Sequence, residues 1–331
     1  MAKRPSVWVS QPLFDDVIER LRSNFQVIMS NEVKQYSSDE IADCLRQVDG
    51  AIVTINEHIG YPEVSGALRL RVIANVGVGY ENLDIEALNE LSVIATNTPG
   101  VLTETTADFA FGLLIATARR IAESDRWIRD GHWRQWSFDA MLGADLHRSV
   151  LGILGMGRIG QAVARRAIGF NMRVLYHNRN RLQSQIEHNC RAEYVGLDAL
   201  LERSDHLLVA LPYSSRIHHL VGPAALARMK PTATLVNIAH GGIVDETALV
   251  NALANGRLAA AGLDVFETEP NVPPALLALP NVVLTPHIGS ASVAARRAMA
   301  TLAVDNLTAG LGWGPNAGHP PTPISVKSVR K

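Results

Sequence analysis

The sequence predicts an α/β protein of two domains, each built on a doubly wound parallel sheet. The chain has 331 residues, and domains average roughly 150 residues, so this length fits two of them. Short apolar runs alternate with amphipathic segments, which is typical of parallel sheets that helices cover on both faces. The alternation breaks at residues 98–100 (TPG) and starts again at Val150. We therefore expect a separate sheet on each side of the break.

The first hundred residues contain five apolar runs that we expect to be strands. A helix should follow the first run, and a second helix should begin at the polar start signal 37–40 and end at about Leu45. The expected strands are 7–9, 27–29, 51–53, 72–74 and 93–95, and the first helix is 13–21.

The segment after the break contains an unusually apolar helix, 107–118. A helix that is apolar all round is buried in a core or an interface. Trp127, Trp133 and Trp136 follow it among charged residues. Ordinary packing would explain these residues, but Trp and Arg are also enriched at interface hot spots. We expect the helix and the Trp-bearing segment to be buried in a homodimer, because they lack enough polar surface to face water.

The second series begins at Val150. Its expected strands are 150–154, 174–176, 207–211, 235–238, 260–263 and 282–284. Helical patterns cover 158–168, 197–202, 223–229 and 245–254, and a last helix runs from about Val293 to Leu311. The tail from Gly312 is rich in Pro and Gly and shows no periodicity.

Composition excludes several classes of protein. Lys and Arg number 31 against 32 Asp and Glu, whereas a dedicated nucleic-acid binder carries a basic face. Cys44 and Cys190 match no metal-ligand spacing, so we expect no metal site and no disulfide scaffold. The N-terminus lacks the apolar stretch of a signal peptide, and no apolar run reaches the roughly 20 residues that span a bilayer. The sequence favours a soluble, cytoplasmic protein that binds neither nucleic acid nor membrane.

The strongest local motif is the run 155–160, GMGRIG. It follows an expected strand and opens an expected helix, which is the context that a dinucleotide-binding site requires. Each glycine has a role: the first allows a tight turn, the second lets the pyrophosphate approach, and the third permits close packing. The unpaired N–H groups at the helix start favour phosphate. The expected cofactor residues here are Gly155, Gly157, Arg158, Ile159 and Gly160.

The end of the second strand of this series indicates which dinucleotide is preferred. NAD-specific sites place an acidic residue there, but this sequence has none between His177 and Arg181. It has Asn178, Arg179, Asn180 and Arg181, and an Arg fork matches a 2′-phosphate bidentately. Alternatively, these residues would form a basic loop that is exposed to solvent and has no role in cofactor binding. We expect NADPH to be preferred over NADH.

Three later segments, 236–246, 262–270 and 285–290, each follow an expected strand. Ligands of doubly wound sheets bind at this carboxyl edge. His287 lies in the third segment. A lone His is usually structural, but one that meets a Glu across a cleft is a credible acid, because the carboxylate raises its pKa and orients the ring.

Five stretches together resemble the D-isomer-specific 2-hydroxyacid dehydrogenase family, nearest to the bacterial glyoxylate/hydroxypyruvate (2-ketogluconate) reductases. The resemblance extends from about Val27 to Leu311. The stretches are VGVGYENLD (76–84), LTETTAD (102–108), LGMGRIG (154–160), AGLDVFE (261–267) and PHIGS (286–290).

The resemblance implies how the domains are arranged. A flavodoxin-like substrate domain would comprise 1–100 and 289–331, and a Rossmann nucleotide domain, 101–288, would be inserted into it. The active cleft would lie between the domains, and closure would exclude water from hydride transfer.

The resemblance also implies roles for individual residues. His287 would be the general acid and Glu269 its partner, while Val76 and Gly77 would donate backbone N–H groups to the substrate carboxylate. The implied substrate site adds Ser290. The implied cofactor contacts add Thr106, Pro212, Ile238, Asp264, His287 and Gly289.

His240 departs from the family pattern, which has an Arg that clamps the substrate carboxylate before Gly241. Arg is always charged and bidentate, whereas His offers at most one donor per nitrogen. Losing such a contact costs roughly 1.5–3 kcal/mol. The departure is compatible with a weakened enzyme, an altered substrate or a decayed site.

Three functions therefore stay open. The first is an NAD(P)H-dependent reductase of small 2-keto acids such as glyoxylate, hydroxypyruvate or 2-ketogluconate, with His287, Glu269 and His240 at the catalytic site. The second is a silent cofactor-binding protein on the same fold, although a silent protein has no need of both Glu269 and His287. The third is a dehydrogenase of formate or phosphite, but formate dehydrogenases have Gln where Glu269 stands.

Overall fold

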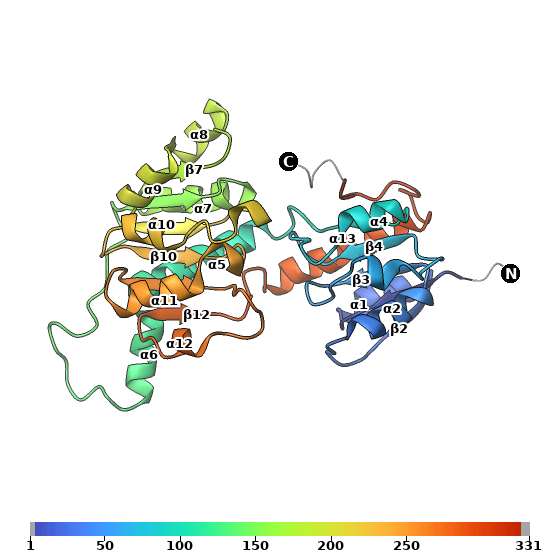
Figure 1. The fold of residues 1–331 in the computed structure, drawn as a ribbon, viewed down its shortest axis with the longest axis horizontal. Helices are drawn as coiled ribbons and strands as arrows, with labels where there is room; N and C mark the ends of the chain where they lie inside the picture. Colours follow the sequence, from blue (N-terminus) through green and yellow to red (C-terminus); the bar gives the residue numbers. More distant parts are fainter. Residues whose placement is uncertain (1–3, 326–331) are drawn as a thin grey trace. The chain divides into compact units, whose positions relative to one another are not determined.

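The apolar runs of the first hundred residues form one parallel sheet, and those after Val150 form a second, in the computed structural model of the chain, which describes residues 4–325. The chain divides into two units. Unit 1 takes the described residues up to Leu102 and those from Ser292 onward, and unit 2 takes Thr103–Ala291. The expected α/β class with two parallel sheets is confirmed, with five strands in one sheet and seven in the other (Figure 1).

The sheet of unit 1 has the order β2-β1-β3-β4-β5, the flavodoxin-like order. The central strands β1, β3 and β4 are buried at every position, because helices cover both faces, whereas the edge strand β2 is partly exposed. The strands are β1 (Ser6–Val9), β2 (Gln26–Met29), β3 (Gly50–Val53), β4 (Val72–Asn75) and β5 (Ile94–Thr96).

Five helices belong to unit 1 within residues 4–325. The expected start signal of α2 is a capping box, in which Ser37 and Glu40 satisfy each other's backbone N–H. The helices are α1 (Asp15–Arg22), α2 (Ser38–Arg46), α3 (Tyr61–Val64), α4 (Ile85–Glu90) and α13 (Val293–Gly310). The sequence pattern did not predict the short helices α3 and α4.

Helix α13 makes unit 1 discontinuous, because it returns from the end of the chain to pack on β3 and β4. Figure 1 shows it in red among the blue and cyan elements. Its approach is close: a Cβ on Gly310 would lie 2.8 Å from Val72 Cγ2, and one on Gly50 would lie 2.9 Å from Leu307 Cδ1. The Pro/Gly-rich tail stays in the same unit, where Ile324 N–H donates to Ala95 O at 2.8 Å.

The sheet of unit 2 has the order β12-β11-β10-β9-β6-β7-β8 and is parallel throughout. The order reverses between β6 and β9, the switch point at which doubly wound sheets bind ligands. The strands are β6 (Val150–Leu154), β7 (Arg173–His177), β8 (Ala192–Tyr194), β9 (His206–Val209), β10 (Thr234–Asn237), β11 (Ala260–Leu263) and β12 (Val282–Leu284). The short edge strand β8 was not predicted.

Helices flank both faces of this sheet, and 3-10 turns cover Ser215–Ile217 and Gly241–Ile243. The helices are α5 (Thr103–Ala118), α6 (Ile121–Arg129), α7 (Arg158–Gly169), α8 (Ser184–Cys190), α9 (Leu197–Arg203), α10 (Pro223–Arg228), α11 (Glu246–Ala254) and α12 (Pro274–Leu277). Helices α6, α8 and α12 were not predicted.

Helix α5 is largely buried within its own unit. Most of its apolar residues pack against α7, β10 and β11, while Phe109 and Ile115 are only partly buried, so the expected homodimer stays a prediction. Ala107 and Leu114 are 0% and 1% exposed. The loop after α6 is different, because Trp133 and Trp136 are exposed there. Among the described residues, no helix is both long enough and apolar enough to cross a membrane.

Candidate active site

The expected site residues of unit 2 gather at one edge of its sheet. They follow the carboxyl ends of six neighbouring strands, apart from Thr106, which is on α5. The glycine run follows β6, residues 178–181 follow β7, Pro212 follows β9, Ile238 and His240 follow β10, Asp264 and Glu269 follow β11, and His287, Gly289 and Ser290 follow β12. The topology therefore brings segments more than a hundred residues apart to one edge.

Two glycines of the run are required by the fold itself. Gly155 has a φ of +105°, and a Cβ there would lie 2.6 Å from the Ala210 carbonyl carbon. A Cβ on Gly160 would lie 2.3 Å from Gly155 O, so α7 can approach β6 only with glycine here. These contacts agree with the turn and packing roles expected for the two positions.

Gly157, by contrast, faces open space. It caps α7, and a Cβ there would meet nothing within 4 Å. The space lies at the N-terminus of a helix of 12 residues, where unpaired N–H groups and the helix dipole favour an anion. Thr106 supplies a second sign of a ligand, because its Oγ1 is buried and has no hydrogen-bond partner among the described residues. The residues present therefore fit a bound dinucleotide.

The loop after β7 is tied to this glycine turn. Asn178 Oδ1 accepts the Met156 N–H at 2.7 Å, which fixes the turn. Arg181 makes a bidentate pair with Glu187 of α8, in which its Nε and Nη2 each lie 2.9 Å from a carboxylate oxygen. Although residues 177–181 contain no acid, the fold brings the Glu187 carboxylate to them.

Glu187 also accepts a hydrogen bond from the fully buried Tyr176 hydroxyl at 2.6 Å. The hydrogen bonds from Arg181 and Tyr176 lower the pKa of Glu187 to about 2. Burial, followed by the bond to Glu187, raises the pKa of Tyr176 to about 12. The exposed Arg181 is thus held by the buried pair of Glu187 and Tyr176, which the sequence motif did not indicate.

His287 and Glu269 form the expected pair. Nδ1 of His287 lies 2.8 Å from Glu269 Oε2, while Glu269 Oε1 accepts the Phe266 N–H at 2.9 Å. Burial alone would raise the pKa of Glu269, but the hydrogen bond and charge of His287 outweigh it and hold that pKa below its usual value. His287 has a φ of +53°, a left-handed conformation that is uncommon outside glycine.

Asp264 fixes the loop that carries His287. Its carboxylate accepts the N–H groups of Ile288 and Gly289, both at 2.8 Å, and the Thr285 hydroxyl at 2.7 Å. Asp264 is 2% exposed, and this burial raises its pKa even though the three donors act in the opposite direction. Asp264 therefore organises residues 285–289 in addition to any cofactor contact.

His240 lies on a tight turn after β10. Its Nδ1 accepts the Gly242 N–H at 3.1 Å, and its carbonyl oxygen accepts from Asn237 Nδ2 at 3.0 Å. A Cβ on Gly241 would lie 1.9 Å from the Phe266 carbonyl carbon, so this turn packs directly on the backbone that leads to Glu269. A positive charge on His240 would be close enough to lower the pKa of Glu269.

An aromatic and histidine cluster lines the turn. Tyr213 stacks on His240, with ring centroids 4.2 Å apart and planes 18° from parallel. The Tyr213 hydroxyl lies 3.2 Å from His218 Nδ1, and His218 stacks on His219. His218, His219 and Glu267 offer metal-ligand atoms within 4.8 Å of one another. The hydrogen bond between His219 and Glu267, with the stacking of His218 on His219, is sufficient to explain why these three side chains lie close together.

Glu246 is a buried carboxylate beneath the same turn. It is 7% exposed and accepts the Glu267 N–H at 2.9 Å. Burial, together with the nearby charges of Glu267 and Glu269, raises its pKa. Sequence reasoning missed Glu187, Tyr213 and His218, because no motif marks them and only the fold brings them to the site. Glu246 ends the expected segment 236–246, but sequence reasoning gave it no role.

In unit 1, the structure corrects the prediction that Val76 donates its backbone N–H to the substrate. The N–H of Val76 donates to Val53 O at 2.8 Å and thereby continues the sheet, so it is already used in this structure. Gly77 comes next in the loop, and its carbonyl oxygen accepts the Thr98 N–H. Asn75 Nδ2 donates to Gly79 O at 2.8 Å and shapes this loop from within. Of the two expected backbone donors, Val76 is therefore already engaged, and the role of Gly77 stays a prediction.

Comparisons with known proteins agree with the motifs. The profile described as D-isomer specific 2-hydroxyacid dehydrogenase, NAD binding domain, matches residues 111–289. The chain is 42% identical over 331 residues to a glyoxylate reductase from Thermococcus gammatolerans, an alignment that covers 99% of this chain and 98% of the relative.

Two solved structures share the whole fold. An NADPH-dependent glyoxylate/hydroxypyruvate reductase from Sinorhizobium meliloti, in complex with NADP and malonate, is 37% identical with a TM-score of 0.84, covering 98% of this chain and 97% of the other. A glyoxylate reductase from Paecilomyes thermophila is 31% identical with a TM-score of 0.86, covering 99% of this chain and 100% of the other.

Proposed function

The chain belongs to the D-isomer-specific 2-hydroxyacid dehydrogenase family, and we propose that it is an NADPH-dependent reductase of small 2-keto acids such as glyoxylate and hydroxypyruvate. The observation that carries the proposal is the pair of His287 and Glu269, joined at 2.8 Å at the carboxyl edge of the unit 2 sheet. A protein without catalytic activity would have no chemical use for this pair.

His287 acts as the general acid in this proposal. A carboxylate can only accept, so the Nδ1 that faces Glu269 carries a hydrogen, and the negative charge stabilises the imidazolium. The Nε2 proton then goes to the keto oxygen, which becomes the hydroxyl of the product. Asp264 holds the backbone of the His287 loop, and Glu269 holds the ring, so the proton is presented in a fixed direction.

The cofactor is held by unit 2, which we assign as the nucleotide domain, with unit 1 as the substrate domain. Bound NADPH supplies the hydride that the keto carbon receives. The α7 N-terminus and the open face of Gly157 would hold the pyrophosphate, and Thr106, Pro212, Ile238 and the 285–289 loop would contact the nicotinamide part. The substrate contacts that we expect are the N–H of Gly77 on unit 1, and Ser290 and His240 on unit 2.

The proposal is tested by following the loss of NADPH absorbance with glyoxylate, hydroxypyruvate, pyruvate and 2-ketogluconate. We expect turnover of at least one acid, and a fall of about 100-fold or more in kcat for His287→Gln, the usual range for a lost general acid. A protein that binds NADPH but reduces none of these acids would instead be a silent member of the family.

The preference for NADPH rests on the loop after β7. Within it, Arg181 is paired with Glu187. This pair neutralises the Glu187 carboxylate, which would otherwise repel a 2′-phosphate, and it leaves Arg179 as the main candidate to contact that phosphate. Replacing both Arg179 and Arg181 with Ala should weaken NADPH at least tenfold more than NADH, measured by fluorescence titration. Equal losses for the two cofactors would remove the argument.

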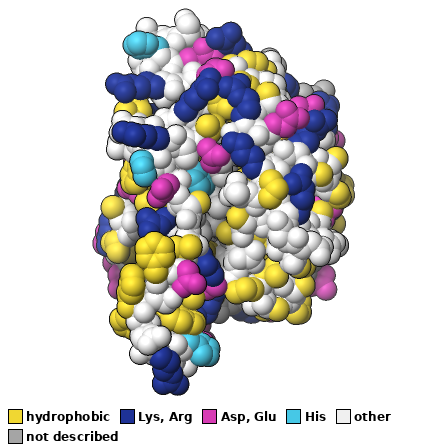
Figure 2. Space-filling view, turned by 90° about the vertical axis from the view of Figure 1, so that its left-hand side faces the viewer, with side chains coloured by type: hydrophobic (Ala, Val, Ile, Leu, Met, Phe, Trp, Pro, Cys, Tyr) yellow, Lys and Arg dark blue, Asp and Glu magenta, His cyan; other side chains and the backbone are white. Residues whose placement is uncertain are grey.

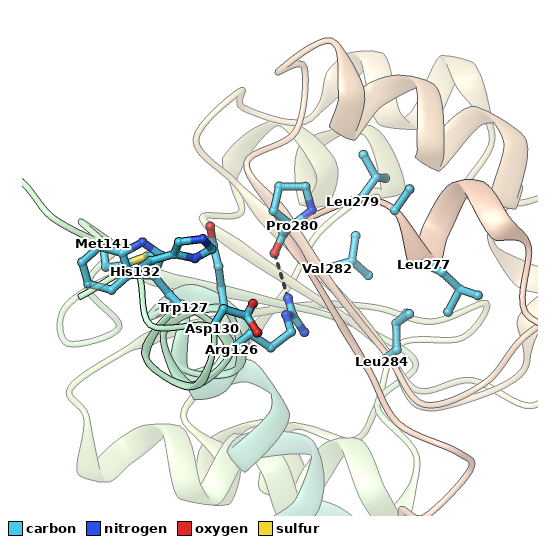
Figure 3. A pocket seen from close by; sticks show the side chains of 12 residues that line it. Arg126, Trp127, Asp130, His132, Met141, Leu277, Leu279, Pro280, Val282 and Leu284 are labelled. Atoms are coloured by element: carbon cyan, nitrogen blue, oxygen red, sulfur yellow. Dashed lines mark hydrogen bonds between the residues drawn. The ribbon is translucent and has the colours of Figure 1, made fainter. Parts of the chain in front are cut away.

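A homodimer is proposed through the loop after α6. Trp133, Trp136 and Phe138 are 56%, 75% and 86% exposed, and yellow side chains gather at the lower end of the view in Figure 2. Beside this loop lies a pocket of about 430 Å³, between the Arg126–Met141 side and an apolar wall that includes Leu279 and Val282 (Figure 3). The aromatic loop of a second copy suits that wall, because so much apolar surface is rarely left in water.

Light scattering tests the assembly. We expect the mass of a dimer, and a shift toward monomer for the double variant Trp136→Ser/Phe138→Ser. Leu68→Ser is the matched control, because Leu68 is 94% exposed but belongs to unit 1. A monomeric parent protein at micromolar concentration would contradict the proposal.

A further inference from the structure

Two contacts fix the ring of His240. The Gly242 N–H points at its Nδ1 from 3.1 Å, and Tyr213 lies flat against its face at 4.2 Å. A backbone N–H can only donate, so Nδ1 must offer its lone pair and carry no hydrogen. The ring is then the neutral tautomer with its proton on Nε2, an assignment made from the hydrogen bond.

Protonation would break this arrangement. A hydrogen on Nδ1 would face the Gly242 N–H, donor against donor, inside a turn that Gly241 locks against the Phe266 backbone. A half-turn flip of the ring within the stack on Tyr213 would relieve this clash, but the Gly242 N–H would then face a ring C–H and lose its hydrogen bond. The turn therefore opposes the imidazolium form of His240 through this hydrogen bond.

Titratable groups of unit 2 surround the ring. The Tyr213 hydroxyl bonds to His218, and Glu269 is a nearby carboxylate that would favour a positive charge on His240. Both oxygens of Glu269 already accept, one from His287 and one from the Phe266 N–H. The positive charge at this edge is thus placed on His287, whose own Nδ1 faces the carboxylate.

We propose that His240 serves as an uncharged Nε2–H donor, that Tyr213 is the residue that positions it, and that the site consequently accepts uncharged 2-oxo esters about as well as 2-oxo acids. The proposal rests on the reductase function proposed above. A permanently charged residue at this place would favour a carboxylate over an ester, whereas a neutral donor binds the carbonyl oxygen of either group. The inferred substrate class is therefore wider than free 2-keto acids.

The experiment compares pyruvate with methyl pyruvate, and hydroxypyruvate with its methyl ester, by kcat/KM with NADPH. The acid-to-ester ratio is the readout, because both substrates need protonated His287 and its titration cancels. We expect a ratio that changes less than about twofold between about pH 6 and about pH 8, where an ordinary His would gain its charge. A ratio that rises severalfold on acidification would show a charged His240 and overturn the proposal.

Variants separate the two roles. His240→Arg should raise the acid-to-ester ratio at least tenfold, about 1.4 kcal/mol, at every pH. Tyr213→Phe keeps the stack and should keep the flat ratio, whereas Tyr213→Ala frees the ring and should let the ratio rise at low pH. An unchanged ratio in His240→Arg would overturn the inference while leaving the reductase function intact.

A second measurement does not depend on activity. In protein labelled with ¹⁵N-histidine, the ring signals of His240, identified by their loss in His240→Gln, should show a protonated Nε2 and a bare Nδ1 at about pH 7 and about pH 6. An imidazolium signal at the lower pH would refute the proposal. If neither acid nor ester is reduced, the reductase function fails, and this spectrum still decides the state of His240.

Discussion

The two histidine turns at the carboxyl edge of the unit 2 sheet use the same side chain in opposite ways. His287 turns its Nδ1 to a carboxylate oxygen of Glu269, and His240 turns its Nδ1 to the N–H of Gly242. One partner can only accept and the other can only donate, so the first ring is stabilised as a cation and the second as a neutral donor. A histidine in a motif therefore has no defined charge until the atom facing its Nδ1 is known.

The two turns are also held by different means. Residues 285–289 depend on side-chain hydrogen bonds to the buried Asp264. The 240–242 turn depends on the absence of a side chain at Gly241, which allows it to touch the Phe266 backbone. Changes that add bulk should therefore damage the His240 turn most, and changes that remove charge should damage the His287 turn most.

The largest effect should come from Gly241→Ala. Its Cβ would lie 1.9 Å from the Phe266 carbonyl carbon and 2.2 Å from the Glu267 nitrogen, and backbone cannot move aside cheaply. Overpacking of this kind costs about 3 kcal/mol, occasionally more, so we expect a clear loss in the free energy of unfolding by urea denaturation. Gly242→Ala is the matched control, since the nearest atoms to its Cβ belong to side chains, at 3.1–3.5 Å. Equal losses would show that backbone contact does not hold this turn.

A smaller effect should follow Glu269→Gln. The amide oxygen can still accept the Phe266 N–H, but it no longer stabilises a cationic His287, so kcat for keto-acid reduction should fall about 100-fold. The pKa of Glu269 is lowered, so Glu269 is ionised at neutral pH, and its stabilising effect is present above the usual carboxyl pKa and is lost as the pH falls toward the lowered value.

Glu267→Gln is the control for that variant. Glu267 bonds to His219 and carries the same charge two residues away, so its loss changes the local field without removing the partner of His287. Steady-state kinetics should show nearly parental kcat for Glu267→Gln. If both variants lose activity to the same extent, general electrostatics explain the result better than the pair does.

The smallest effect should come from Glu246→Gln, which tests the electrostatics below the two turns. The pKa of Glu246 is raised in the folded protein, so stability falls as the pH rises from the usual carboxyl pKa to the raised value and stays lower above it. The Gln variant mimics the neutral acid and keeps an acceptor for the Glu267 N–H. We expect it to gain up to about 1 kcal/mol near neutral pH, seen as a higher Tm, and to match the parent at pH values below the usual carboxyl pKa.

Sequence reasoning succeeded where one short segment contains the whole physical cause. The turn at Gly155 needs a positive φ, and the packing at Gly160 excludes a Cβ, so both requirements are visible as a glycine spacing between a strand and a helix. The central strands were predicted for the same reason, because strands buried on both faces are continuous apolar runs. The short edge strand β8 and the short helices α3, α4 and α12 lack so strong a pattern, and they were missed.

Tertiary structure decided what depends on partners distant in the chain. Glu187 forms an ion pair with Arg181, the carbonyl oxygen of Val53 accepts the N–H of Val76, and α5 packs against the core of unit 2. The local spacing of residues indicates none of these contacts. The sequence by itself determined the parallel sheets, the glycine turn and the presence of His287, Glu269 and His240. Their charge states were decided by the fold, because a hydrogen-bond partner sets where a proton resides, and the strands bring that partner from another part of the chain.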